Sequence, residues 1–111
     1  GFVFDCRALP NPGRDTELRN FTGLQKPVIE FFENKPEIKA FKDYIFKLTD
    51  QSVENYLKRK FTHLMINFGC TGGQHRSVYL AEQLRKHLET KTGVNVQIRH
   101  RELPENKKQD R

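Results

Sequence analysis

The chain has 111 residues and a formal net charge of +6, which is enough length for one domain with a single hydrophobic core. No apolar run approaches the ~18 residues of a membrane-spanning helix, and the opening residues GFVFDC lack the basic and apolar regions of a signal peptide. These features predict a cytoplasmic domain with an anionic partner. The chain starts almost inside an apolar strand without a methionine, so we expect it to be a piece of a longer protein.

The two cysteines, Cys6 and Cys70, both stand at the ends of predicted strands. Without secretory features, free thiols are expected. The sequence contains neither a Cys-x-x-Cys pair nor zinc-ligand spacing, so we expect no metal site.

The first half of the chain predicts one strand and two helices. Residues 2–4 are apolar on both faces, as in a strand of a sheet that is covered on both sides. A long loop follows, in which residues 10–13 predict a rigid turn. Pro27 is a natural start for a short helix, and the apolar spacing from Pro36 to about Lys60 predicts a long one, with a possible interruption at residues 49–52.

The second half predicts strand, glycine loop, helix and strand. Residues 64–68 have the length of a buried strand, and helical spacing runs from Val78 to about Lys91, where Gly93 suits the position after the helix. Residues 94–98 alternate apolar and polar side chains, as in a strand with one wet face. The last residues, 104–111, are polar and predict a disordered tail beyond a domain of residues 1–103.

This order predicts a small three-layer α/β domain. Its short, mainly parallel sheet would have three or four strands joined by right-handed crossover helices, and sequence before Gly1 would contribute the missing strand. Ligands bind at the carboxyl ends of such strands. Three polar loops should meet there, at residues 5–11, 69–76 and 99–101.

The loop between the second strand and its helix predicts a phosphate-binding site. Glycines let its backbone turn sharply, and the amides at the start of a helix favour an anion. We expect Asp5, Arg7, Asn11, Arg99, His100 and Arg101 to support the site, with Asp5 more plausibly paired to Arg7 or Arg99 than orienting a ligand. The predicted ligand-binding residues are Gly69, Cys70, Thr71, Gly72, Gly73, Gln74, His75, Arg76 and Ser77.

The same loop has an enzymatic interpretation, because Cys70 and Arg76 have the spacing of the signature loop of cysteine-dependent phosphatases. A thiolate at a helix start is stabilised, Ser77 would assist it as a leaving group, and Asp5 would be the general acid. A P-loop NTPase is less well supported because no Gly-Lys-Ser/Thr occurs, and no GxGxxG indicates a dinucleotide fold.

RNA is a second candidate partner, because basic residues gather late in the chain. Arg99, Arg101, Lys107 and Lys108 are the candidate contacts to phosphates. No RRM, KH or double-strand-binding signature accompanies them. A solvated basic tail is the plain alternative.

Four stretches, FDCRALPNPG, TGLQKPV, GCTGGQHRSVYLAEQL and VQIRHREL, resemble in order and spacing the C-terminal domain of the RapZ (YvcJ-like) RNase adapter proteins. The resemblance implies a domain that binds RNA and an amino-sugar phosphate, with a fold similar to a sugar-phosphate-binding part of phosphofructokinase. It also implies a linked kinase-like domain that binds ATP or GTP. Many members have His-Trp where this chain has Gly13 and Arg14.

Taken together, the residues and the resemblance predict a non-catalytic, bacterial regulatory module. It would hold an amino-sugar phosphate, a nucleotide or an RNA backbone phosphate at residues 69–77. No cofactor is expected in this domain. A linked kinase-like or phosphotransferase-like domain and an oligomer are both compatible with this interpretation, and a membrane is not an expected partner.

Overall fold

The computed structural model of the chain describes residues 1–103. The predicted tail, with Lys107 and Lys108, lies outside the described residues. In chain order the elements are β1 (Phe2–Asp5), the 3-10 turn η1 (Pro12–Arg14), α1 (Lys26–Glu33), α2 (Pro36–Arg59), β2 (Ile66–Gly69) and α3 (Arg76–Glu89).

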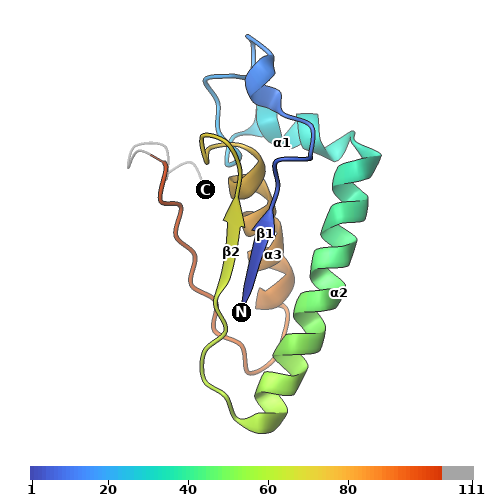
Figure 1. The fold of residues 1–111 in the computed structure, drawn as a ribbon, viewed down its shortest axis with the longest axis vertical. Coiled ribbons are helices and arrows are strands. Elements are labelled where there is room, and N and C mark those ends of the chain that lie inside the picture. Colours follow the sequence, from blue (N-terminus) through green and yellow to red (C-terminus); the bar gives the residue numbers. More distant parts are fainter. Residues whose placement is uncertain (104–111) are drawn as a thin grey trace.

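The strands β1 and β2 form a parallel pair, with Phe2 opposite Ile66 and Asp5 opposite Gly69. They run side by side and point in the same direction, toward the loops in the upper part of the molecule (Figure 1). The amide of Cys6 extends the pairing by donating to the Gly69 carbonyl at 2.7 Å. The loops after β1 and β2 therefore meet at one edge, as the sequence predicts.

The structure confirms a parallel α/β arrangement, but among the described residues the sheet has two strands and not three or four. Residues 94–98 show the alternating burial expected of a strand, yet they make no backbone ladder. The cover on the second face of the sheet is also missing among the described residues, because Val3 is 81% exposed. The predicted third layer is therefore not present in this part of the chain.

The helices start and stop where the local sequence requires. Both α1 and α2 have a proline in the first turn, where its missing N–H costs nothing. The expected interruption near Thr49 is absent, and α2 is one helix of 24 residues. Thr49 is fully buried, so this polar residue faces the core rather than breaking the helix. Lys60 ends α2 in a left-handed conformation with φ 61°.

The helix α3 is the central element of the core. It lies behind the sheet, with α2 beside it (Figure 1). Four of its apolar residues are buried in clusters that include residues of β2, α1 and α2, namely Tyr79, Leu80, Leu84 and Leu88. Val78 is buried with Leu24 and Leu103. Packing along its whole length therefore fixes where α3 begins.

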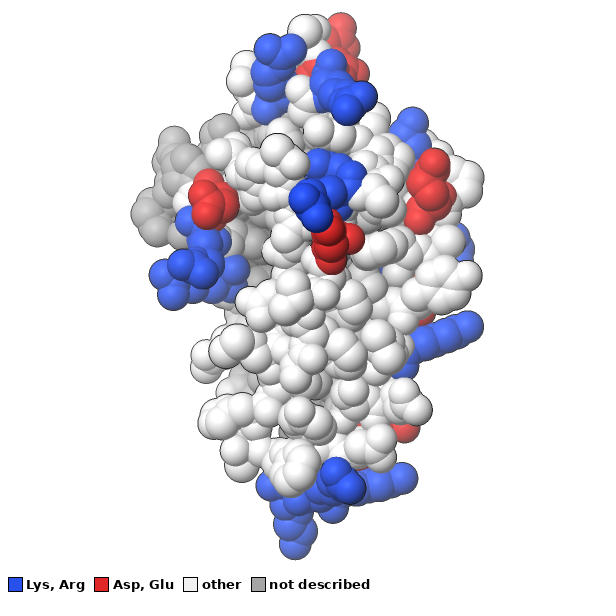
Figure 2. Space-filling view, viewed as in Figure 1, with Lys and Arg blue, Asp and Glu red and all other residues white. Residues whose placement is uncertain are grey.

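Charged side chains gather at the two ends of the face shown in Figure 2, and the middle of that face, over the sheet, is uncharged. No helix of residues 1–103 has the length and apolar character to cross a membrane.

Candidate anion-binding loop

The loop from β2 to α3 has a backbone that only glycine adopts readily. Gly72 and Gly73 follow one another with φ of 80° and 67°, a region that costs other residues roughly 1–2 kcal/mol. A side chain at Gly72 would meet no atom within 4 Å, whereas one at Gly73 would collide with the side chain of Glu102. The loop is thus open to solvent at Gly72 and closed against Glu102 at Gly73.

The first turn of α3 leaves its positive end uncompensated. His75 at the N-cap makes no side-chain capping bond, and no acidic residue occurs in the first turn. The amide of Ser77 donates to the Cys70 sulfur at 3.4 Å. Among the hydrogen bonds of the described residues, none uses the amide of Thr71 or Gly72. Free amides and an unneutralised helix dipole are the elements of an anion site.

Cys70 lies half-buried beneath this loop, and its thiol is unusually acidic for its surroundings. Burial acts to raise its pKa, but hydrogen bonds from the Ser77 hydroxyl and amide, the Gly73 amide, and the charge of Arg76 together lower it. The Ser77 Oγ lies 3.2 Å from the sulfur. A larger fraction of the Cys70 side chain is therefore ionised to the thiolate at neutral pH than in an ordinary cysteine.

Arg76 occupies a structural position that its sequence context does not reveal. The residue is only 4% exposed, and its Nη1 donates to the carbonyls of Arg7 at 2.6 Å and Leu9 at 3.0 Å. Its Nε is buried without a partner among the described residues. Arg76 thus clamps the loop after β1 to the start of α3 and contributes positive charge beneath the glycine loop.

Asp5 and Arg7 confirm the expected ion pair at the end of β1. The carboxylate receives Arg7 Nη2 at 2.7 Å and Nε at 2.9 Å and 3.0 Å. Both side chains are more than half exposed. The hydrogen bonds from the Arg7 side chain and amide lower the pKa of Asp5 to about 2. Asp5 therefore neutralises Arg7 in part and is ionised at neutral pH.

Asn11 and His75 both lie next to Gly13, at the side of the loop. The Asn11 Oδ1 accepts the Gly13 amide at 2.9 Å and caps η1. A Cβ placed on Gly13 would lie 3.5 Å from the His75 ring. The His75 Nε2 is buried and has no hydrogen-bond partner in residues 1–103. The ring therefore packs against η1 with one nitrogen unsatisfied.

The run from Arg99 to Arg101 splits into one buried and two exposed side chains. The His100 Nε2 lies 2.6 Å from Glu82 Oε2 on α3, and both side chains are at least nine-tenths buried. Arg99 and Arg101 are exposed on either side of it. Glu82, which also pairs with Arg85 at 2.8 Å, was not predicted. The sequence signal that could have indicated this role is a single glutamate on the apolar face of the helix.

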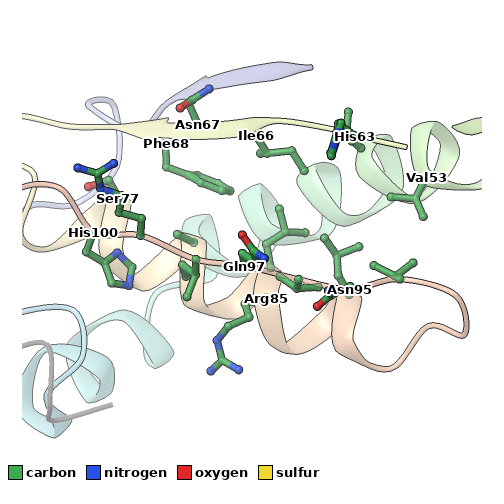
Figure 3. A pocket seen from close by; sticks show the side chains of 18 of the residues that line it. Val53, His63, Ile66, Asn67, Phe68, Ser77, Arg85, Asn95, Gln97 and His100 are labelled. Atoms are coloured by element: carbon green, nitrogen blue, oxygen red, sulfur yellow. The ribbon is translucent and has the colours of Figure 1, made fainter. Parts of the chain in front are cut away.

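A groove of about 530 Å³ opens below the loop. We call it the β2 groove, defined by β2 on one side, residues 93–102 on the other and α3 beneath (Figure 3). Gly69, Cys70, Gly73 and Ser77 line one end of it together with Arg99 and Arg101. Part of the predicted loop thus shares one cavity with the predicted arginine run. Neither the Asp5–Arg7 pair nor the loop residues Thr71, Gly72, Gln74, His75 and Arg76 are among its lining residues. Whether these residues bind a ligand stays a prediction.

Comparison with known proteins identifies relatives across nearly the whole chain. The chain is 47% identical over 106 residues to a nucleotide-binding protein of Haemophilus ducreyi, covering 92% of the chain and 35% of that protein. It is 43% identical over 106 residues to the RNase adapter protein RapZ of Hamiltonella defensa, covering 96% of the chain and 37% of that protein. The chain therefore spans about a third of the length of these relatives. The family described as the RapZ C-terminal domain matches residues 1–104, and the chain belongs to this family.

Proposed function

We propose that this domain is a non-catalytic binding and sensing module that holds a phosphorylated ligand at residues 69–77. Relatives are named nucleotide-binding protein and RNase adapter protein RapZ, and these names support a regulatory role in which the domain binds rather than converts its ligand.

The observation that carries the proposal is the bare, positive start of α3. The helix has 14 residues and neither a side-chain cap nor an acidic residue in its first turn. The preceding glycines, Gly72 and Gly73, both have positive φ, and the amides of Thr71 and Gly72 make no hydrogen bond within residues 1–103. An anion with several oxygens, such as a phosphate, would satisfy these amides together.

The neighbouring charges favour a ligand that is larger than inorganic phosphate. Arg99 and Arg101 are exposed and line the same groove as the loop, so they are free to contact further phosphate or hydroxyl oxygens. Arg7 is already paired to Asp5 and therefore contributes less positive charge for a ligand. An amino-sugar phosphate, a nucleotide or an RNA backbone fits this distribution of charge.

Calorimetric titration with glucosamine 6-phosphate, glucosamine and inorganic phosphate tests the proposal. We expect the sugar phosphate to bind more tightly than phosphate, and the unphosphorylated sugar to show no measurable binding. Equal affinity for glucosamine and its phosphate would contradict recognition through the phosphate group.

RNA binding is tested separately through its salt dependence. If the loop and the two arginines hold backbone phosphates, log K should fall steeply with log salt, and Arg101→Gln should reduce the slope by about one. A slope near zero would exclude backbone recognition.

The lowered pKa of Cys70 and its contact with Ser77 keep a cysteine-dependent phosphatase as the second candidate. Two features of the site weigh against it. Arg76 is committed to the carbonyls of Arg7 and Leu9, and Asp5, with a pKa of about 2, holds no proton to donate at neutral pH. Turnover of an aryl phosphate that disappears in Cys70→Ser would support the enzyme, and the absence of turnover between about pH 5 and 8 would end it.

A further inference from the structure

The two cysteines of the chain stand opposite one another just past the ends of β1 and β2. In the parallel ladder the amide of Phe2 donates to the carbonyl of the residue before its partner. The amide of Cys6 donates in the same way to Gly69 at 2.7 Å, so the partner of Cys6 in this register is Cys70. Neighbouring strands lie about 4.8 Å apart, which is within the roughly 4.4–6.8 Å that separates the Cα atoms of disulfide-bonded cysteines.

The side chains of both cysteines belong to the same face of the sheet. Phe4 and Phe68 are opposite each other in the register, and their ring centroids lie 5.4 Å apart. Cys6 and Cys70 come two residues later along each chain, and side chains two residues apart in a strand share a face. Cys70 packs against the core cluster that contains Cys6, and both thiols are free. The register therefore brings two free thiols together on the inner face of the sheet.

The two thiols differ in their access to solvent and in their acidity. Cys6 is fully buried, and this burial, increased by the neighbouring Cys70, raises its pKa to about 12. Cys70 is only half-buried. Burial acts to raise its pKa, but hydrogen bonds with Ser77 and from the Gly73 amide hold it below the ordinary value of 9.0. An oxidant in solution therefore reaches and attacks Cys70 first, and Cys6 remains beside it as a second, protected thiol.

From this pairing we propose that Cys6 and Cys70 are a redox-sensitive pair, in which a hydroperoxide oxidises Cys70 and Cys6 then closes a disulfide bond with it. In the first step the Cys70 thiolate attacks a peroxide oxygen and the O–O bond breaks. Cys70 becomes a sulfenic acid, and the second oxygen takes up a proton and leaves as water or an alcohol. In the second step the Cys6 sulfur attacks the Cys70 sulfur, and the hydroxyl group leaves with the Cys6 proton as water. The two thiols lose two electrons in total, and the peroxide gains them.

The disulfide would add a covalent link between the loop after β1 and the glycine loop. Arg76 already joins the loop after β1 to the start of α3 through the carbonyls of Arg7 and Leu9. A bond from Cys6 to Cys70 would fix the residue at which the glycine loop begins, and a thiol reductant would release it. The modification thus lies inside the loop of the proposed function, but its formation needs no phosphorylated ligand and is tested without one.

The test exposes the reduced, unmodified chain to hydrogen peroxide, blocks the remaining thiols with N-ethylmaleimide and maps the peptides by mass spectrometry without reductant. We expect the tryptic peptides that contain Cys6 and Cys70 to be joined, and dithiothreitol to restore both thiols. The proposal is overturned if peroxide leaves both thiols free. It is also overturned if Cys70 is oxidised to a sulfinic acid, or joined to a second molecule, without the bond to Cys6.

A matched pair of variants tests the roles of the two thiols with dimedone, a reagent that traps sulfenic acids. In Cys6→Ala no second thiol is available, so Cys70 should carry at least about tenfold more dimedone than in the unmodified chain. In Cys70→Ala the buried Cys6 should carry less than about a tenth of that amount. Equal labelling of Cys70 with and without Cys6 would contradict the closing step. Equal labelling of the remaining cysteine in the two variants would contradict the assignment of Cys70 as the thiol that is oxidised first.

Discussion

The two loops at the carboxyl edge of the sheet start from paired positions and differ in almost every other respect. Asp5 is opposite Gly69, and a cysteine follows each of them. Cys6 is fully buried, and the carbonyls of its loop are held by Arg76. The loop after β2 is exposed from Thr71 to Gly72, and the amides of these two residues make no hydrogen bond within residues 1–103. One loop serves as the support of the site, and the other carries the surface that a ligand would contact.

The cause of the difference lies in α3. Its first residue, Arg76, reaches across to the β1 loop rather than to its own glycine loop. A single side chain thus fixes the loop after β1, whereas the glycine loop keeps the amides of Thr71 and Gly72 unused within residues 1–103. A loop with free amides beside a fixed support is typical of binding sites.

The reactivity of the two cysteines gives the largest expected contrast. Burial raises the pKa of Cys6 to about 12, whereas the pKa of Cys70 falls below its ordinary value of 9.0. After allowance for the weaker nucleophilicity of the more acidic thiol, Cys70 should react with iodoacetamide at pH 7 at least about fiftyfold faster.

Mass spectrometry of the labelled peptides measures this contrast. In denaturant the two rates should converge, because the environments of both thiols are lost. In the folded Ser77→Ala variant Cys70 should slow, since one of the bonds that lowers its pKa is removed. Equal labelling of both cysteines in the native chain would show that the two loops do not differ as described.

The Arg76 clamp gives the next largest effect. Arg76→Met retains much of the buried stem but leaves the carbonyls of Arg7 and Leu9 unsatisfied, so we expect a loss of about 2–4 kcal/mol in the free energy of unfolding. The matched control is Arg99→Met at an exposed position, which should change it by less than about 0.5 kcal/mol. Urea denaturation measures the free energy of unfolding of both variants. A loss as small in Arg76→Met as in Arg99→Met would contradict the clamp.

The Asp5–Arg7 pair gives the smallest effect, because both side chains are exposed. The pKa of Asp5 falls from 3.8 to about 2 in the folded chain. Its contribution is therefore present above about pH 4 and is lost as the pH falls toward 2. Asp5→Asn should make the thermal midpoint less dependent on pH in this window, and Arg7→Gln should do the same. An unchanged pH profile in both variants would mean that the pair does not form in solution.

Local patterns in the sequence were sufficient to predict β1, β2 and the helices, because apolar spacing and prolines act over a few residues. They also brought the three polar loops to one edge. The prediction of a sheet strand at residues 94–98 was wrong, because a strand needs a neighbouring strand for its backbone hydrogen bonds and none of the described residues provides one. The alternating burial of these residues was nevertheless predicted.

The site was predicted in its backbone and less well in its side chains. Glycines report the loop conformation directly, since the positive φ at Gly72 and Gly73 needs them. Arg76 binds carbonyls that lie 67 and 69 residues away in the sequence. His100 binds Glu82, which lies 18 residues away. Spacing within one motif carries no information about such contacts, so neither the clamp nor the role of Glu82 was predicted.

The central claim, that the glycine loop binds phosphate through its backbone, is tested most directly by comparing two glycine variants. Gly72 and Gly93 have φ of 80° and 82°, so alanine should cost each about 1–2 kcal/mol of stability, and neither new Cβ would collide with its surroundings. Calorimetric titration with glucosamine 6-phosphate should show binding weakened by at least about tenfold in Gly72→Ala, the loss of roughly one charge-assisted hydrogen bond. In Gly93→Ala it should show wild-type affinity. Equal affinity in both variants would contradict the claim.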